Sequence, residues 1–226
     1  MKKICVCNQK GGSTKSSTAI LCGLALARGA RVLLVDADPQ GGLSSFMGDP
    51  GPGTYDMIMG ERPDIHTVDR HGVQLDYIAA DYKLDMLYAT IGHLAIKNAL
   101  KLIDREYDYI IFDTPPTCQG ITRAAAHVSD EIIIPADISK STIRPTLYTI
   151  EQIKQMEKVG RVVLIGKDPG DRTGYVSELT RDFIRQLGKH FAGFIDKSAT
   201  MQKVCAGVSK MNDKQAEKIK GVMLWK

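Results

Sequence analysis

Lys10-Gly11-Gly12-Ser13-Thr14-Lys15-Ser16-Ser17 is the stretch from which the fold can be predicted. An apolar run, residues 4–7, precedes it, and a helix-like run over residues 18–28 follows it. A strand, a glycine-rich turn and a helix in this order can bind phosphate, because backbone N–H groups turn toward the anion and the helix N-terminus adds positive charge. We expect residues 10–17 to bind a nucleotide in this way, with the Ser16 hydroxyl as a ligand of Mg²⁺.

This loop departs from the common G-x-x-x-x-G-K-[ST] form at two positions. An additional lysine, Lys10, precedes the first glycine, and Thr14 stands where a glycine usually precedes the P-loop lysine. A β-branched residue resists a positive φ, so Thr14 is the one residue of the loop that the motif does not explain.

Two further apolar runs end in carboxylates. Residues 31–36 end at Asp36, with Asp38 two positions later, and residues 107–113 end at Asp113. Buried parallel strands are apolar along their whole length, and ligands bind outside their carboxyl ends. We expect Asp36 and Asp113 to serve a Mg²⁺ ion and Asp38 to orient the attacking water in ATP hydrolysis.

Strand-like and helix-like runs alternate along the whole chain. They predict an α/β fold with a doubly wound, mostly parallel sheet, helices on both faces, and a single P-loop domain over residues 1–226. Two long helices are expected, over residues 84–103 and 175–190. The five cysteines are scattered without a C-x-x-C pair, which favours a reducing, cytoplasmic setting, and Cys5 and Cys7 are expected to share a face in the core.

Three segments together resemble the ParA group of partition ATPases, over about residues 2–165. The loop from Lys10 to Ser16 resembles the K-G-G-x-x-K-[ST] pattern of the ParA and MinD ATPases, residues 35–40 resemble V-D-x-D-P-Q, and residues 109–116 resemble the Walker B segment. The D-P-Q ending separates ParA-like proteins from MinD-like ones.

The resemblance implies a mechanism with ATP and Mg²⁺ as cofactors. In such proteins two subunits sandwich two ATP molecules, Lys10 would reach the partner's phosphates, and Asp38 would be needed for hydrolysis, with Lys15 as the P-loop lysine. The ATP-bound homodimer would bind DNA without sequence preference, and a centromere-binding, ParB-like adaptor would stimulate hydrolysis and release. No helix-turn-helix segment precedes the loop, so we expect the short form of the family, associated with the nucleoid.

The C-terminal third is basic. Residues 151–226 contain 15 Lys/Arg and 9 Asp/Glu, whereas the whole chain has a formal net charge of +4. Like charges repeated at helical spacing repel one another unless an anion binds them. The residues expected to contact DNA are Arg172, Arg181, Arg185, Lys189, Lys197 and Lys203. Glu178 and Asp182 could instead neutralise this stripe.

Two assignments stay open from the sequence alone. Lys167 and Asp168 are candidates to contact the adenine, because they follow a strand and Asp196 replaces a proline that the family often has in the neighbouring one. Ile219, Val222, Met223 and Trp225 could form a membrane-binding helix in a MinD-like positioning ATPase, although an end helix packed on the sheet is the expected arrangement. A scaffold that binds nucleotide and hydrolyses little is the third alternative.

Overall fold

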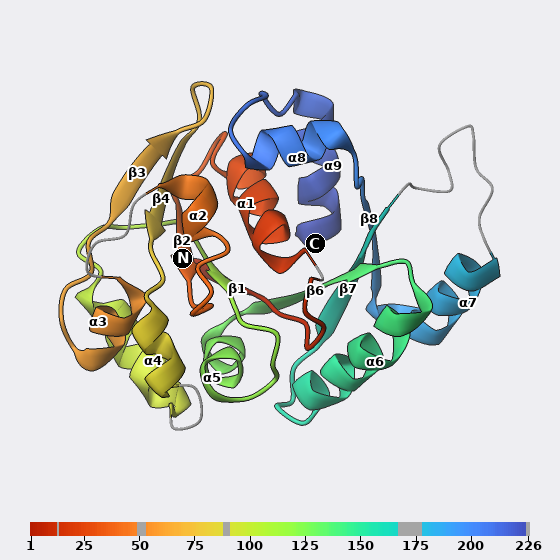
Figure 1. Ribbon diagram of the computed structural model, residues 1–226, viewed down its shortest axis with the longest axis horizontal. Coiled ribbons are helices and arrows are strands. Elements are labelled where there is room, and N and C mark those ends of the chain that lie inside the picture. Colours follow the sequence, from red (N-terminus) through yellow and green to blue (C-terminus); the bar gives the residue numbers. More distant parts are fainter. Residues whose placement is uncertain (13, 49–52, 88–90, 167–177, 225–226) are drawn as a thin grey trace.

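The computed structural model describes residues 1–226 except 13, 49–52, 88–90, 167–177 and 225–226. Its centre is an eight-stranded sheet in the order β3-β4-β2-β5-β1-β6-β7-β8 (Figure 1). The strands are β1 (Lys2–Val6), β2 (Val32–Asp36), β3 (His66–Asp69), β4 (Gln74–Ile78), β5 (Tyr109–Asp113), β6 (Glu131–Asp137), β7 (Gly160–Ile165) and β8 (Phe191–Ile195). All neighbouring strands are parallel except the β3–β4 pair.

Helices cover both faces of the sheet (Figure 1). One face carries α1 (Lys15–Leu26), α8 (Ala199–Cys205) and α9 (Asp213–Met223); the other carries α3 (Thr54–Met59), α4 (His93–Ala99), α5 (Gly120–Val128), α6 (Lys140–Lys154) and α7 (Glu178–Leu187). The short helix α2 (Ser44–Met47) follows β2. The short 3₁₀ helices of the described residues are η1 (Tyr82–Leu87), η2 (Leu100–Leu102) and η3 (Gly188–His190). The predicted doubly wound α/β class is confirmed.

Two apolar cores lie on the two sides of the sheet, because successive side chains of a strand point to opposite faces. Ile4 and Val6 of β1 belong to the core under α1, α8 and α9, whereas Cys5 and Cys7 are fully buried in the core under α3 to α7. The expectation that the two cysteines share a buried face is therefore correct, and all five cysteines are free thiols.

The predicted long helix over residues 84–103 is wrong. The chain forms η1, then α4 from His93, and then η2, with Gly92 in an extended conformation immediately before α4. The apolar periodicity that suggested one helix comes from separate turns that each bury a residue, such as Leu84 and Ile96. The helix predicted over residues 175–190 is α7, which ends at Leu187 because Gly188 adopts a φ of 51°.

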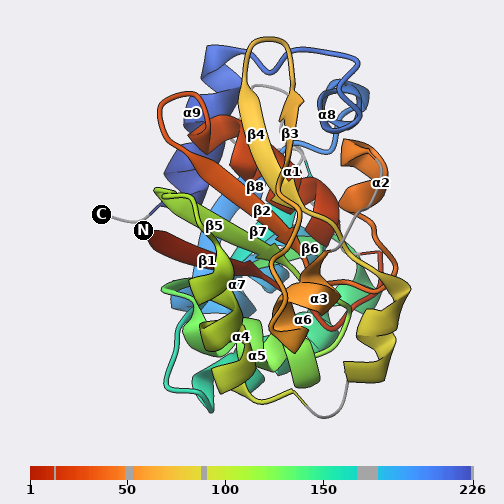
Figure 2. The ribbon, with the colours of Figure 1, turned by 90° about the vertical axis from the view of Figure 1, so that its left-hand side faces the viewer.

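Both edges of the sheet are irregular; Figure 2 faces the edge formed by β3, and β8 forms the far edge. At one edge, β3 has four residues and runs antiparallel to β4. At the other edge, β8 carries a bulge, because Val162 pairs with Phe191 and the next residue, Val163, pairs with Gly193. Gly193 has a φ of 136°, and a Cβ there would lie 3.0 Å from the side chain of Val222, so glycine is required at this bulge.

Candidate active site

The phosphate-binding loop follows β1, which lies in the sheet between β5 and β6. Val6, the last residue of β1, pairs with Asp113 of β5 and Ile133 of β6, and α1 begins nine residues later at Lys15. Asn8 secures the start of the loop: its Nδ2 donates to the Pro135 carbonyl at 2.8 Å, and its Oδ1 accepts from the Lys10 N–H at 3.1 Å. The loop is therefore tied to β6 before it turns into the helix.

Thr14 has a left-handed backbone, with φ of 61° and ψ of 26°, and it is the N-cap residue of α1. Its carbonyl accepts the Thr18 N–H at 2.8 Å, which begins the helix. A left-handed conformation costs an L-residue about 1–2 kcal/mol, and more for a branched side chain. The sequence identified the conflict at this residue, and the structure shows that the loop keeps the strained conformation.

Asp36 and Asp113 are opposite each other at the ends of β2 and β5, as predicted from their positions. Both side chains are fully buried. Asp36 is completely hydrogen-bonded: Oδ1 accepts the Asp38 N–H at 3.1 Å, and Oδ2 accepts the Ser44 N–H at 2.8 Å and the Ser44 hydroxyl at 2.7 Å. Burial raises its pKa to about 6, although the hydrogen bonds from Ser44 and Asp38 oppose the shift. Asp36 thus holds the loop after β2; its predicted role toward Mg²⁺ stays a prediction.

Asp113 differs from Asp36 in its contacts. Neither of its carboxylate oxygens has a hydrogen-bond partner within the described part of the chain. Burial and the charge of Asp36 raise the pKa of Asp113 well above its usual value, against the opposing effects of the Ser16 hydroxyl and the Lys15 ammonium. A buried carboxylate without a partner is costly. A Mg²⁺ ion with its water shell would fit this side chain, together with Ser16, because Mg²⁺ prefers hard oxygen ligands.

Lys15 and Asp38 complete this buried group. Lys15 is 7% exposed, and burial lowers its pKa, while the nearby charges of Asp113 and Asp38 limit the shift. The Asp38 Oδ1 accepts the Gln40 N–H at 3.0 Å, which fixes the carboxylate at the start of its loop. The same loop contacts the phosphate-binding loop, since a Cβ on Gly42 would lie 2.6 Å from the Ser16 hydroxyl.

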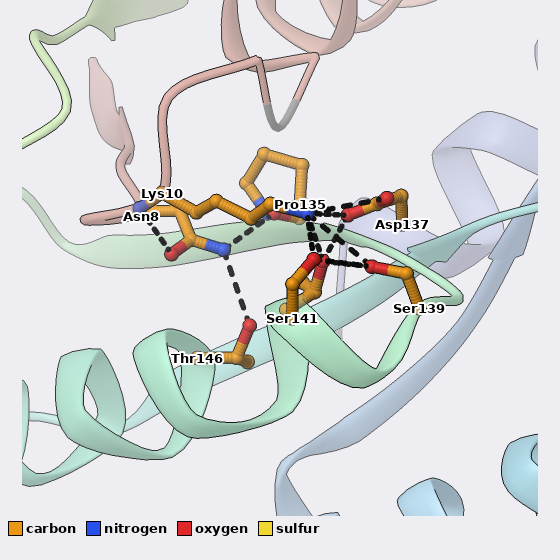
Figure 3. A network of polar contacts seen from close by, with 8 residues as sticks. Asn8, Lys10, Pro135, Asp137, Ser139, Ser141 and Thr146 are labelled. Carbon is orange, nitrogen blue, oxygen red and sulfur yellow. Dashed lines mark hydrogen bonds and ion pairs between the residues drawn. The ribbon is translucent and has the colours of Figure 1, made fainter.

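Lys10 lies in a network of polar contacts with the segment after β6 (Figure 3). Its Nζ is 3.0 Å from the Asp137 Oδ1, 3.3 Å from the Ser139 hydroxyl and 3.1 Å from the Ser141 hydroxyl. The ammonium group also contacts the Thr142 hydroxyl. Figure 3 shows its side chain extended along the end of β6 toward Asp137. In a single chain, Lys10 is therefore satisfied by partners of its own subunit.

A small apolar pocket of about 70 Å³ adjoins the start of α1. Ser17 lines it from α1, Ile165 and Ile195 from the ends of β7 and β8, and Asp196 and Lys197 from the segment after β8. Met201, Gln202 and Cys205 of α8 also line it. No sequence motif indicated these α8 residues, because their relation to the loop depends on how α8 packs on α1. Ser13, Lys167 and Asp168, also predicted to bind nucleotide, lie outside the described residues.

The residues predicted to bind DNA do not form one surface. Arg181, Arg185 and Lys189 are exposed on α7 and η3, whereas Lys203 is exposed on α8, on the opposite side of the sheet (Figure 1). Lys197 lines the apolar pocket beside the phosphate-binding loop. Asp182 pairs with Arg185 at 2.9 Å, so part of the α7 charge is neutralised within the helix. Arg172 lies outside the described residues.

The fold and this site define the class: a P-loop nucleoside triphosphatase fold in which a second lysine precedes the loop. A family described as an AAA domain matches residues 1–161. The sporulation initiation inhibitor protein Soj of Bacillus subtilis is 33% identical over 173 residues, covering 72% of this chain and 66% of Soj. The chain therefore belongs to the ParA-type partition ATPases.

A second curated relative and a solved structure are also similar to this chain. The maintenance of carboxysome distribution protein A of Gloeothece citriformis is 27% identical over 178 residues, covering 71% of this chain and 66% of that protein. The matched region thus spans slightly less than two thirds of the length of either curated relative. A plasmid partition protein of Borrelia burgdorferi, solved with AMPPNP, superposes with a TM-score of 0.80 at 20% identity over 98% of this chain and 96% of that one, which shows a shared fold.

Proposed function

We propose that this chain hydrolyses ATP and uses the ATP-bound state to bind DNA as a homodimer. The observation that carries this proposal is the buried group formed by Lys15, Asp38 and Asp113 beside a phosphate-binding loop. Both carboxylate oxygens of Asp113 lack a hydrogen-bond partner within the described residues, and Mg²⁺ bound to a triphosphate would supply the opposite charge there. The AMPPNP bound to the Borrelia relative is consistent with this nucleotide class.

The residues have separate roles in the proposed site. Lys15 and the loop N–H groups would bind the phosphates, and Ser16 and Asp113 would hold Mg²⁺, directly or through its waters. The ion neutralises developing phosphate charge. Asp38 orients the attacking water, and Asp36 keeps the Asp38 loop in place through its bonds to Ser44 and to the Asp38 N–H.

Lys10 is the residue that would link hydrolysis to a second subunit. On dimerisation this lysine would exchange the contacts with Asp137 for the partner's phosphates, so hydrolysis would depend on association. The apolar pocket between α1 and α8 would receive the base, since it lies immediately beside Thr14 and Ser17.

The output of the cycle is proposed to be reversible attachment to the nucleoid. Exposed Arg181, Arg185 and Lys189 would contact the phosphate backbone without reading bases, and a dimer doubles the number of contacts. A ParB-like adaptor would stimulate hydrolysis and release. The cargo is not assigned, because the relatives are named for sporulation, carboxysome distribution and plasmid partition.

DNA binding measured with ADP, ATP and AMPPNP tests this function. We expect duplex DNA to be retained with ATP or AMPPNP and lost with ADP. Asp38→Ala should bind ATP as well as the parent and lose turnover by about 100-fold or more, as for a residue that positions the nucleophile. Equal turnover in the variant would remove Asp38 from the mechanism, and DNA binding indifferent to nucleotide would reject the switch.

The alternative of a membrane-bound positioning ATPase has less support. Ile219, Val222 and Met223 of α9 face α1 and the sheet and are at most 9% exposed, so these apolar side chains are packed in the core. None of the helices in the described ranges has the length and apolar character needed to cross a bilayer. Co-sedimentation with anionic lipid vesicles, with and without residues 217–226, separates the two hypotheses.

A further inference from the structure

A basic hollow of about 610 Å³ lies between α4 and α5, far from the nucleotide site. Its lining includes Lys3 near the start of β1, whereas the phosphate-binding loop follows the other end of that strand. His93 and Lys97 of α4 and His127 at the end of α5 form its walls. The two helices pack side by side under the sheet (Figure 1). Nothing in the proposed ATPase cycle uses this surface.

The ionisable side chains that line the hollow are all basic. Lys3, His93, Lys97, Lys101 and His127 line it, and no carboxylate does so among the described lining residues. Asp130 is an acidic group beside the lining, with its Oδ2 3.4 Å from the Lys3 Nζ. Neither Lys97 nor Lys101 has a described ion pair; Lys101 contacts only the Asn98 side-chain oxygen, at 3.1 Å. Such a concentration of like charge favours an anionic ligand.

His127 lies beside His93, where its protonation would respond to a bound anion. Their rings are 4.3 Å apart, tilted by 40°. The His127 side chain is exposed, and slight desolvation together with the charges of His93, Lys158 and Arg123 lowers its pKa. Lys3, Lys97 and Lys101 add cations from β1, α4 and η2, and Asp130 is the opposing charge beside Lys3. A carboxylate bound nearby would raise this pKa again.

Apolar side chains distinguish this surface from a DNA-binding one. Leu94 is 60% exposed at the rim, and Leu100 and Val128 line the interior beside the lysines. Phosphate backbones need cations and polar donors, and they gain nothing from exposed leucine. A concave surface with cations and apolar groups interleaved suits an amphipathic helix whose leucines face the groove and whose acidic residues meet the rim.

We propose that the hollow between α4 and α5 is a docking site for an acidic, amphipathic segment of a partner protein. The test uses the full chain and a fluorescein-labelled helical peptide with leucines at i, i+4 and i+7 and glutamates between them. A peptide with lysine in place of every glutamate is the control. We expect saturable binding of the acidic peptide, weakening as salt rises, and none of the basic one.

Variants locate the site. Lys97→Glu with Lys101→Glu should weaken peptide binding about tenfold, or ~1.4 kcal/mol, and Leu94→Ala should also weaken it. Lys154→Glu with Lys214→Glu, at exposed positions of α6 and α9, makes the same change in net charge as a control and should bind as the parent does. Because the hollow is separate from the nucleotide site, unchanged ATP turnover in the double variant confirms that it is folded. Unchanged circular dichroism and urea unfolding of the double variant give a second folding control, which does not depend on the proposed ATPase cycle.

Nuclear magnetic resonance titration of the histidine rings gives an independent readout. The pKa of His127 should rise on addition of the acidic peptide and stay unchanged in the presence of the basic one. Equal affinity of the parent and the double variant would overturn the proposal, as would a His127 pKa that the peptide does not move. Displacement of the peptide by duplex DNA or inorganic polyphosphate at lower concentration would also reject it, because the surface would then be a phosphate site.

Discussion

At the scale of single residues, Thr14 carries the most local strain in the candidate active site. Its left-handed φ of 61° is a conformation that glycine adopts freely and alanine does not. Thr14→Gly and Thr14→Ala both remove the hydroxyl. The difference between their free energies of unfolding therefore reports the cost of the left-handed backbone conformation. We expect the glycine variant to have a free energy of unfolding about 1 kcal/mol higher than the alanine variant, measured by urea denaturation.

The control for Thr14 is Ser17, which lies within α1. At a right-handed helical position the order reverses, and Ser17→Gly should be less stable than Ser17→Ala by about 1 kcal/mol. The same order at both positions would mean that the left-handed conformation is absent from the free protein in solution.

The raised pKa of Asp36 leads to a prediction of how the stability of the nucleotide-free protein depends on pH. A folded-state pKa of about 6 exceeds the usual aspartate value, so the native state binds more protons than the unfolded state in this window. The contribution of Asp36 to stability therefore falls as pH rises from about 4 to about 6, by on the order of 2 kcal/mol. Urea titrations of parent and Asp36→Asn in EDTA should diverge over this range, and parallel curves would contradict the raised pKa.

At the scale of elements, the contact between Lys10 and the segment before α6 has to break if the lysine acts on a partner subunit. The pair is about one quarter exposed on both sides and is worth ~1 kcal/mol by itself. Burial alone would raise the pKa of Asp137, but hydrogen bonds from Thr142 and Lys10 lower it below its usual value. The carboxylate therefore remains ionised and holds Lys10 at neutral pH.

Asp137→Asn should release the lysine. We expect the dimeric fraction with AMPPNP, measured by light scattering, to increase because the association constant rises about fivefold, the equivalent of ~1 kcal/mol. Asp130→Asn, which disturbs the pair with Lys3 at the other end of β6, is the matched control and should leave the fraction unchanged. An unchanged dimeric fraction in Asp137→Asn would show that the intrasubunit contact does not oppose association.

The elements also show what local sequence patterns can predict. Val32–Asp36 and Tyr109–Asp113 were predictable because buried parallel strands are continuously apolar, and their shared edge then brings Asp36 and Asp113 together. The strand β3 and the helix α8 were missed. The four residues of β3 are mostly polar and become a strand only through pairing with β4. Likewise, Lys10 and Asp137 are 127 positions apart, and no local pattern relates them.

At the scale of the whole molecule, the basic residues of the C-terminal third are divided between the two sides of the sheet. The sequence showed their number, but the division depends on β8, which separates α7 from α8. Arg181→Glu with Arg185→Glu should abolish ATP-dependent DNA binding in a mobility-shift assay if the α7 side makes the contacts.

The control for this experiment reverses charges on the other side of the sheet. Lys203→Glu with Lys210→Glu changes the net charge equally on exposed residues of α8 and the segment after it. This variant should keep ATP-dependent DNA binding and lose only about twofold in affinity from the weaker overall field. The opposite result would assign DNA binding to the α8 side.

The two irregular edges of the sheet have a consequence for self-association. An exposed strand edge can recruit a strand from another molecule and lead to aggregation. Here one edge is the four-residue β3, and the other is interrupted by the bulge at Gly193, where α9 packs closely. Neither edge offers a long, flat template for added strands. In the proposed cycle, association would then be confined to the nucleotide face and would stay reversible even at high local concentration, because neither sheet edge favours permanent strand pairing.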